Sequence, residues 1–111
     1  MVDDLVEIVW TKRSQHNMHK IYNFIYKDSP KNALKVVEDI AKGVYKAKSN
    51  PEYYNPDKYK IVNDKSYRAS EMHHYRVVYR FTNNVIRVLK VTHTKMNPKE
   101  YWLNGQQQIA H

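Results

Sequence analysis

The sequence contains no cysteine among its 111 residues, which excludes disulfide bonds and catalytic thiolates. The absence of cysteine is typical of a reducing compartment, so we expect a cytoplasmic protein. Acidic residues at positions 3, 4 and 7 stand where a secretory signal peptide would carry basic charge. No apolar run approaches the length of about 20 residues that a membrane-spanning helix needs, and we expect no membrane partner.

Acidic residues are also scarce in one half of the chain. Residues 58–99 hold ten basic residues and two acidic ones, Asp64 and Glu71, whereas the rest of the chain carries nine of each sign. The whole net charge of +8 therefore belongs to residues 58–99. Clustered positive charge is typical of a protein that binds a polyanion, most often nucleic acid, or an acidic protein.

The most regular pattern in this basic half predicts a β-hairpin. Residues 75–82 and 85–92 are rich in Val, Ile, Tyr and Phe, as strands are. Asn83 and Asn84 between them tolerate positive φ, as a two-residue type I′ turn requires. A two-residue turn sets the register, which we extend outward from Thr82 opposite Val85 to His74 opposite His93.

One face of this hairpin is expected to be buried and the other to be basic. In the predicted register, Arg80 lies opposite Arg87, with Arg76 and His93 on the same basic face. Like charges directly opposite one another destabilise a sheet, and neither strand contains an acid. An uncompensated pair of this kind often marks a functional surface. The alternative is that the long arginine side chains simply extend into water.

Upstream of the hairpin, apolar residues recur at helical spacing in two segments. We expect a short strand over residues 5–10, a helix over residues 12–26, and a second helix that starts at Ser29-Pro30 and stops before Pro51. The apolar face of the second helix is predicted to comprise Ala33, Leu34, Val37, Ile40, Ala41, Val44 and Tyr45. His16 and His19 lie one turn apart in the first helix, but no third ligand is evident, and we expect no metal and no cofactor.

This order of elements predicts an α+β fold. We expect an N-terminal strand and an antiparallel helix hairpin packed on one face of a curved, three- to four-stranded antiparallel sheet. Residues 3–101 would form this single domain, and residues 102–111 would form a polar C-terminal tail.

Three segments of the chain, WTKRSQHNMHKIYNFIYKDSPKNALKVVEDI, YRASEMHHYRVVYRF and VIRVLKVTHTKMNP, resemble the RelE/ParE superfamily of type II toxin–antitoxin toxins, and its ParE branch most closely. The resemblance implies a growth-inhibiting toxin that a cognate antitoxin neutralises. ParE-like members poison DNA gyrase, whereas RelE-type members are ribosome-dependent endoribonucleases that cleave mRNA. The likeness to the ParE branch favours gyrase as the target.

The resemblance also implies site residues, which differ between the two mechanisms. For a nuclease, the matching catalytic positions are Arg68, Arg76 and His93. Arg76 and His93 share a face in the predicted register, but Arg68 joins them only if a three-residue loop connects its strand to the next. RNA cleavage needs such a set because proton transfer and phosphate neutralisation must occur together.

A gyrase-directed toxin needs no catalytic set. Its expected target-binding residues are Arg76, Arg80, Arg87 and Lys95. A third alternative, a non-catalytic nucleic-acid-binding module, would use the same basic face, but that face has few aromatic residues on which bases could stack.

Overall fold

The computed structural model describes residues 5–60 and 62–95, so the expected tail at residues 102–111 lies outside the described residues. Within the described ranges the chain forms two helices and a four-stranded sheet, which confirms the α+β class. In chain order the elements are β1 (Glu7–Trp10), α2 (Lys12–Tyr26), α3 (Pro30–Ser49), β2 (Tyr67–Met72), β3 (Tyr75–Thr82) and β4 (Val85–His93).

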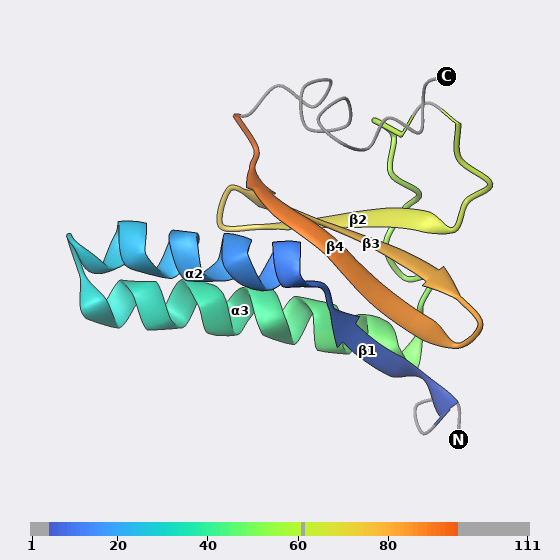
Figure 1. Cartoon of the computed structure of the whole chain (residues 1–111), viewed down its shortest axis with the longest axis horizontal. Coiled ribbons are helices and arrows are strands. Elements are labelled where there is room, and N and C mark those ends of the chain that lie inside the picture. Colours follow the sequence, from blue (N-terminus) through green and yellow to red (C-terminus); the bar gives the residue numbers. More distant parts are fainter. Residues whose placement is uncertain (1–4, 61, 96–111) are drawn as a thin grey trace.

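Both helices begin where the sequence predicted. The Thr11 side chain accepts a hydrogen bond from the backbone N–H of Ser14 and caps α2. The Ser29 side chain caps α3 in the same way, and Pro30 occupies the first turn, where its missing N–H is not needed. The helices run antiparallel, side by side (Figure 1), because only a short link separates them.

The sheet has the strand order β1-β4-β3-β2. The pairs β2–β3 and β3–β4 are antiparallel, but β1 runs parallel to β4. The sheet is therefore mixed, whereas the sequence predicted an antiparallel one. Parallel neighbours need a long crossover connection, which the helix hairpin and the two strands β2 and β3 supply.

The β3–β4 hairpin has the predicted turn, with φ of 52° at Asn83 and 60° at Asn84. The predicted register holds from Thr82–Val85 to Tyr79–Val88. Beyond that point a β-bulge at Leu89 shifts the pairing by one residue. The predicted pairs that are wrong for this reason are Val78–Leu89, Val77–Lys90, Arg76–Val91, Tyr75–Thr92 and His74–His93.

The core lies between the helix hairpin and one face of the sheet. Its buried members are Val6, Ile21, Val36, Ile40, Val44, Ala47, Val77, Tyr79, Ile86, Val88 and Val91. Tyr79 and Val88 lie on the buried face of the hairpin, in one cluster with residues of both helices. On α3 the buried stripe also includes Val36 and Ala47. Three predicted members of the apolar face are instead exposed: Leu34 (51%), Tyr45 (64%) and Ala41. In the parts of the chain that are described, neither helix is long and apolar enough to cross a bilayer.

Ile40→Ala should lower the free energy of unfolding by about 2–5 kcal/mol. Ile40 is 1% exposed, so removing most of its side chain leaves a cavity in the core. Leu34→Ala on the same helix is the matched control, with an expected change of about 0.5 kcal/mol or less. Urea denaturation of both variants measures the difference. Equal losses would contradict the assigned helix face.

Candidate functional site

The face of the sheet that points away from the helices carries a buried ion pair. Arg76 on β3 and Asp57 in the loop before β2 are 7% and 2% exposed. One guanidinium nitrogen of Arg76 lies 2.8 Å from Asp57 Oδ1, and another lies 2.8 Å from Glu71 Oε2. The guanidinium also stacks on the Tyr59 ring, 4.6 Å from its centroid. Arg76 thus ties the loop to the sheet, since a buried charge needs this degree of pairing.

The like-charged pair predicted from the sequence is present on the same face. Arg80 lies directly opposite Arg87, but the two side chains differ in their surroundings. Arg80 is half-buried, donates from Nε to Ser66 Oγ at 3.0 Å, and lies over the Tyr67 ring. Arg87 is exposed. Because Arg80 turns back toward the loop, the repulsion between the two charges is reduced.

The Asp64 carboxylate accepts hydrogen bonds from the side chain and the backbone N–H of Ser66, and these bonds lower its pKa. The positive charge of Arg80 lowers this pKa as well. An acid therefore lies close to Arg80, although neither strand supplies one. The sequence signal for it is the Asn63-Asp64 turn immediately before β2.

Lys90 is buried on this face, at 1% exposure. The Leu89 bulge places it opposite Val78 instead of Val77. Loss of hydration lowers the pKa of Lys90 to about 7, and the charge of Arg13 adds to this effect while Asp57 opposes it. The predicted register placed Lys90 opposite Val77 on the other face of the hairpin. The sequence therefore offered no indication of its position, which results from the bulge.

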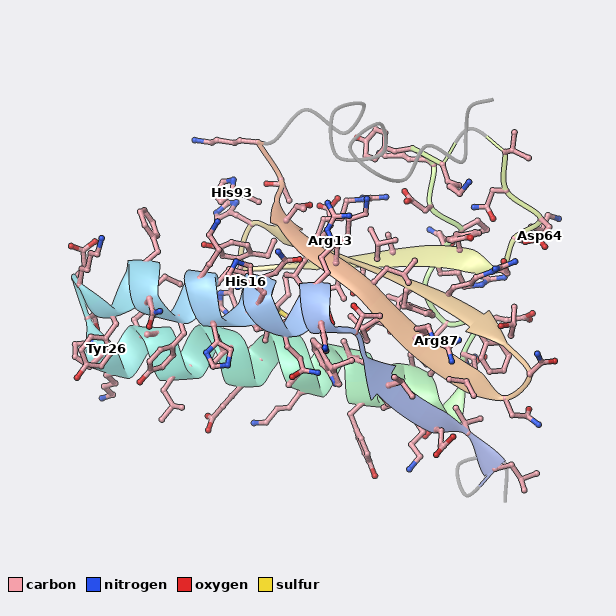
Figure 2. The ribbon with its side chains drawn as sticks, viewed as in Figure 1. Arg13, His16, Tyr26, Asp64, Arg87 and His93 are labelled. Carbon is pink, nitrogen blue, oxygen red and sulfur yellow. The ribbon has the colours of Figure 1, made fainter. Side chains whose placement is uncertain are left out.

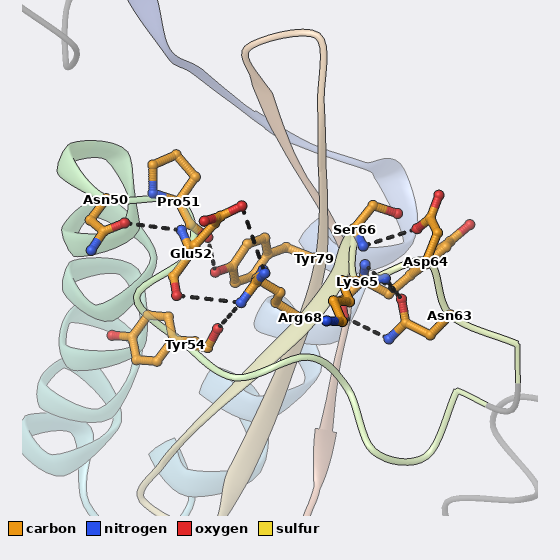
Figure 3. Close-up of polar contacts among 11 residues, drawn as sticks. Asn50, Pro51, Glu52, Tyr54, Asn63, Asp64, Lys65, Ser66, Arg68 and Tyr79 are labelled. Atoms are coloured by element: carbon orange, nitrogen blue, oxygen red, sulfur yellow. Dashed lines mark hydrogen bonds and ion pairs between the residues drawn. The ribbon is translucent and has the colours of Figure 1, made fainter.

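Arg68 faces the other way, toward the helices. The β2–β3 turn is a two-residue turn, His73-His74, with φ of 53° and 68°, and a two-residue turn points Arg68 inward. The Arg68 guanidinium donates to the carbonyl oxygens of Glu52 at 3.3 Å and Tyr54 at 2.8 Å (Figure 3). Arg68 therefore fixes the segment that follows α3.

His93 also lies on the helix side, because the bulge pairs it with Tyr75. Its ring packs edge-on against the Tyr75 ring, with centroids 5.2 Å apart, and its Nδ1 accepts a hydrogen bond from the Lys95 backbone at 3.1 Å. The expectation that His93 and Arg76 share a face is wrong. The structure therefore does not bring Arg68, Arg76 and His93 together.

The exposed Lys95 lies two residues beyond the end of β4. His93 and Arg87 stand near opposite ends of that strand (Figure 2). Of the expected target-binding residues, Arg80 and Arg87 lie opposite each other, whereas Lys95 lies at the end of the sheet that carries His93.

His93 instead contributes to a groove between α2 and the end of β4, which has a volume of about 510 Å³. The lining residues are Arg13, Asn17, Lys20, Ile21, Phe24, Tyr75, Val91, Thr92 and His93. Sequence reasoning did not identify this groove, because its lining residues come from α2 and from two strands that are far from α2 in the chain. Among the described residues, no three histidine or acidic side chains are placed to hold a metal ion.

A family model described as "ParE toxin of type II toxin-antitoxin system, parDE" matches residues 8–98. That span includes all six helices and strands except the first residue of β1. A search of curated proteins finds no match.

Solved toxin structures share the fold at low identity. The chromosomal ParDE system of P. aeruginosa gives a TM-score of 0.65 at 19% identity, covering 80% of this chain and 96% of that one. The RelBE2 toxin–antitoxin complex of Mycobacterium tuberculosis gives 0.52 at 19% identity, covering 79% and 96%. The YoeB dimer of Staphylococcus aureus gives 0.53 at 16% identity, covering 79% and 95%.

Asp57→Asn should destabilise the protein by about 3–5 kcal/mol, because it leaves the buried Arg76 guanidinium without its buried counter-charge. Glu71→Gln removes the other carboxylate of the same arginine, whose side chain is 55% exposed, and should cost no more than about 1 kcal/mol. Chemical denaturation of both variants tests the difference. A Glu71→Gln loss as large as that of Asp57→Asn would show that Asp57 is not the dominant partner.

Stability should rise between pH 7 and pH 9. Over this range the folded protein's Lys90, with a pKa of about 7, loses most of its proton. In the unfolded chain the same side chain stays protonated, so the unfolded state binds more protons. The slope should approach about 1.4 kcal/mol per pH unit. Thermal unfolding across this range measures it, and Lys90→Met should flatten the profile. An unchanged slope in Lys90→Met would assign the effect to another group.

Proposed function

The chain belongs to the ParE toxin family of type II toxin–antitoxin systems, and from this membership we propose that it arrests growth by poisoning DNA gyrase and is neutralised by a cognate antitoxin. Gyrase acts on the chromosome, so the toxin would work in the cytoplasm. The ParDE system and the RelBE2 complex are toxin–antitoxin assemblies, and this supports an antitoxin partner for the present chain.

One observation supports gyrase rather than mRNA as the target: the Arg76 side chain is already paired with carboxylates of its own chain. A nuclease of this superfamily would use Arg76 together with His93 and Arg68, with the arginines neutralising the phosphate. In this chain the Arg76 guanidinium is buried between two carboxylates, and Arg68 is bound to loop carbonyls. His93 lies on the face opposite to Arg76. A gyrase poison requires no such assembly.

The proposed target-binding residues are Arg80, Arg87 and Lys95. Arg87 and Lys95 are exposed, and Arg80 is half-buried beside Arg87. Arg76 was predicted to belong to this group, but its part would be indirect, since it holds the loop against the strand that carries Arg80.

One observation favours mRNA cleavage as the second candidate function. The exposed His93 lines the same groove as Arg13 and Lys20. Its ring therefore shares a groove with two cationic side chains, neither of which belongs to the expected catalytic set of Arg68, Arg76 and His93. A histidine in this setting could transfer a proton during phosphodiester cleavage, which contributes on the order of 10²–10⁴ in rate. A non-catalytic nucleic-acid-binding module has no comparable observation in its favour.

The test is to induce wild-type protein and His93→Gln in cells and to compare gyrase-dependent DNA breaks with mRNA cleavage at ribosomes. Wild type should produce DNA breaks and leave mRNA intact. His93→Gln removes the titratable group but keeps size and hydrogen bonding, and it should retain most of the growth arrest because gyrase poisoning needs no proton transfer.

His16→Gln is the matched control, since His16 is an exposed histidine on the surface of α2 (Figure 2). If His93→Gln alone abolished growth arrest while remaining folded, and mRNA cleavage disappeared with it, the gyrase mechanism would be rejected. Absence of growth arrest by the wild type would reject the toxin function itself.

A further inference from the structure

Helix α3 carries two rows of apolar side chains, and the fold buries one of them. The buried row comprises Ala33, Val36, Ile40, Val44 and Ala47. The sequence pattern also assigned Leu34, Ala41 and Tyr45 to the apolar face, yet all three are exposed, Leu34 at 51% and Tyr45 at 64%. A contiguous apolar surface left in water is typical of a site that a partner covers.

Two hollows lie along this exposed row, between α3 and the antiparallel α2 beside it (Figure 1). One has a volume of about 230 Å³ and is lined by Met18, His19, Tyr22 and Val37. The other, of about 280 Å³, is lined by Trp10, Gln15, Met18, His19 and Ala41. Met18 and His19 line both hollows, so the two adjoin. We call the surface formed by the hollows together with Leu34 and Tyr45 the outer helix face.

The border of the outer helix face on α3 carries charges of both signs. Glu38 and Lys42 are exposed and one helical turn apart, and neither forms an ion pair within the described part of the chain. Lys35, by contrast, is already paired with Asp39 at 3.1 Å. A partner of one sign would be repelled by one of the two border charges. A copy of the same surface can instead bring each charge to its opposite.

An antiparallel pair of α3 helices from two copies matches these side chains to one another. If Leu34 of one copy lies beside Tyr45 of the second copy, the same register places Glu38 beside Ala41 of the second copy. Lys42 of the second copy is then only one residue away from Glu38. Two-fold symmetry repeats each of these contacts. Ala41 has a small side chain near the middle of the row, which lets the two helices approach closely.

We propose that the outer helix face is a contact between two copies of this chain, related by a two-fold axis that crosses α3 between Glu38 and Ala41. The apolar rows cover each other, and two pairs of Glu38 with Lys42 lie at the border. The row from Leu34 to Tyr45 is roughly 16 Å long, and the two helices together are roughly 20 Å wide. Because this area is small for an interface, we expect a Kd on the order of 10 µM.

The contact between copies is separate from the groove beside β4. That groove is lined on α2 by Arg13, Lys20 and Phe24, whereas the outer helix face is lined on α2 by Met18 and Tyr22. The two sets of residues lie on different sides of α2, so a second copy leaves the groove accessible. The inference does not depend on the proposed function, because it concerns only how the chain associates with itself.

Sedimentation equilibrium of the full chain at physiological salt measures self-association, at concentrations from about a tenth to about thirty times the expected Kd. Leu34→Glu puts a charge into the apolar row and should raise the Kd at least about tenfold. Phe24→Glu is the matched control, since Phe24 is an apolar residue that is 68% exposed on the other side of α2. It should change the Kd by no more than about twofold. Circular dichroism with a thermal melt verifies folding. The urea comparison of Leu34→Ala with Ile40→Ala is made below this Kd, where the chain is monomeric.

Reversing the border charges tests the antiparallel register. Glu38→Lys and Lys42→Glu, each made alone, bring like charges together twice in a dimer and should raise the Kd at least about threefold. An equimolar mixture of these two variants should dimerise again, because every border pair then joins opposite signs. The double variant that carries both changes should also dimerise like wild type. A substitution that merely damaged the fold would not be rescued by mixing.

Four outcomes would overturn the assignment. A wild-type chain that stays monomeric over the whole concentration range rejects self-association. If Phe24→Glu abolishes dimerisation and Leu34→Glu does not, the contact lies at the groove beside β4. If the mixture of charge variants fails to dimerise although each variant alone is weakened, the antiparallel register is wrong. If the wild type is monomeric and Leu34→Glu weakens binding of the antitoxin, the outer helix face contacts the antitoxin and not a second copy.

Discussion

An extra residue in β4, Leu89, determines what the second half of that strand presents to each face of the sheet. The bulge sends Val91 into the helix-facing core and His93 to the helix side, and it places Lys90 on the opposite face. Burying Val91 stabilises the fold by about 1.5–3 kcal/mol, and this gain opposes the cost of taking Lys90 out of water. The groove, the place of Val91 in the core and the burial of Lys90 depend on that one shift in register.

The described residues of the loop between α3 and β2 (50–60 and 62–66) have almost no regular structure, and side chains from the sheet hold them in place. Arg68 binds the carbonyls that follow α3, the Tyr79 hydroxyl donates to the Pro51 carbonyl at 2.8 Å, and Arg76 pairs with Asp57. Two of the arginines that give this half its positive charge therefore act inside the molecule. The surface available to an anionic partner is accordingly smaller than the net charge of +8 indicates.

Features fixed by local chemistry could be predicted from the sequence, as the Thr11 and Ser29 caps and the Asn83-Asn84 turn illustrate. The bulge could not, because nothing in the segment VIRVLKVTH or its neighbours marks Leu89 as an extra residue, and the choice depends on packing against α2. Asp57 was missed for a related reason. It precedes the basic stretch by one residue and meets Arg76 only in the folded chain.

The two candidate surfaces lie on opposite sides of one sheet, which limits how far a partner on one side affects the other. The groove opens on the helix side, whereas Arg80 and Arg87 face away from it. At physiological salt, exposed charges are screened beyond about 8 Å, and a helix layer alone is about 10 Å thick. A second copy on the outer helix face would therefore leave the potential around Arg87 nearly unchanged. Self-association is accordingly compatible with contact to an anionic target through Arg80 and Arg87, and a dimer would present two such arginine pairs.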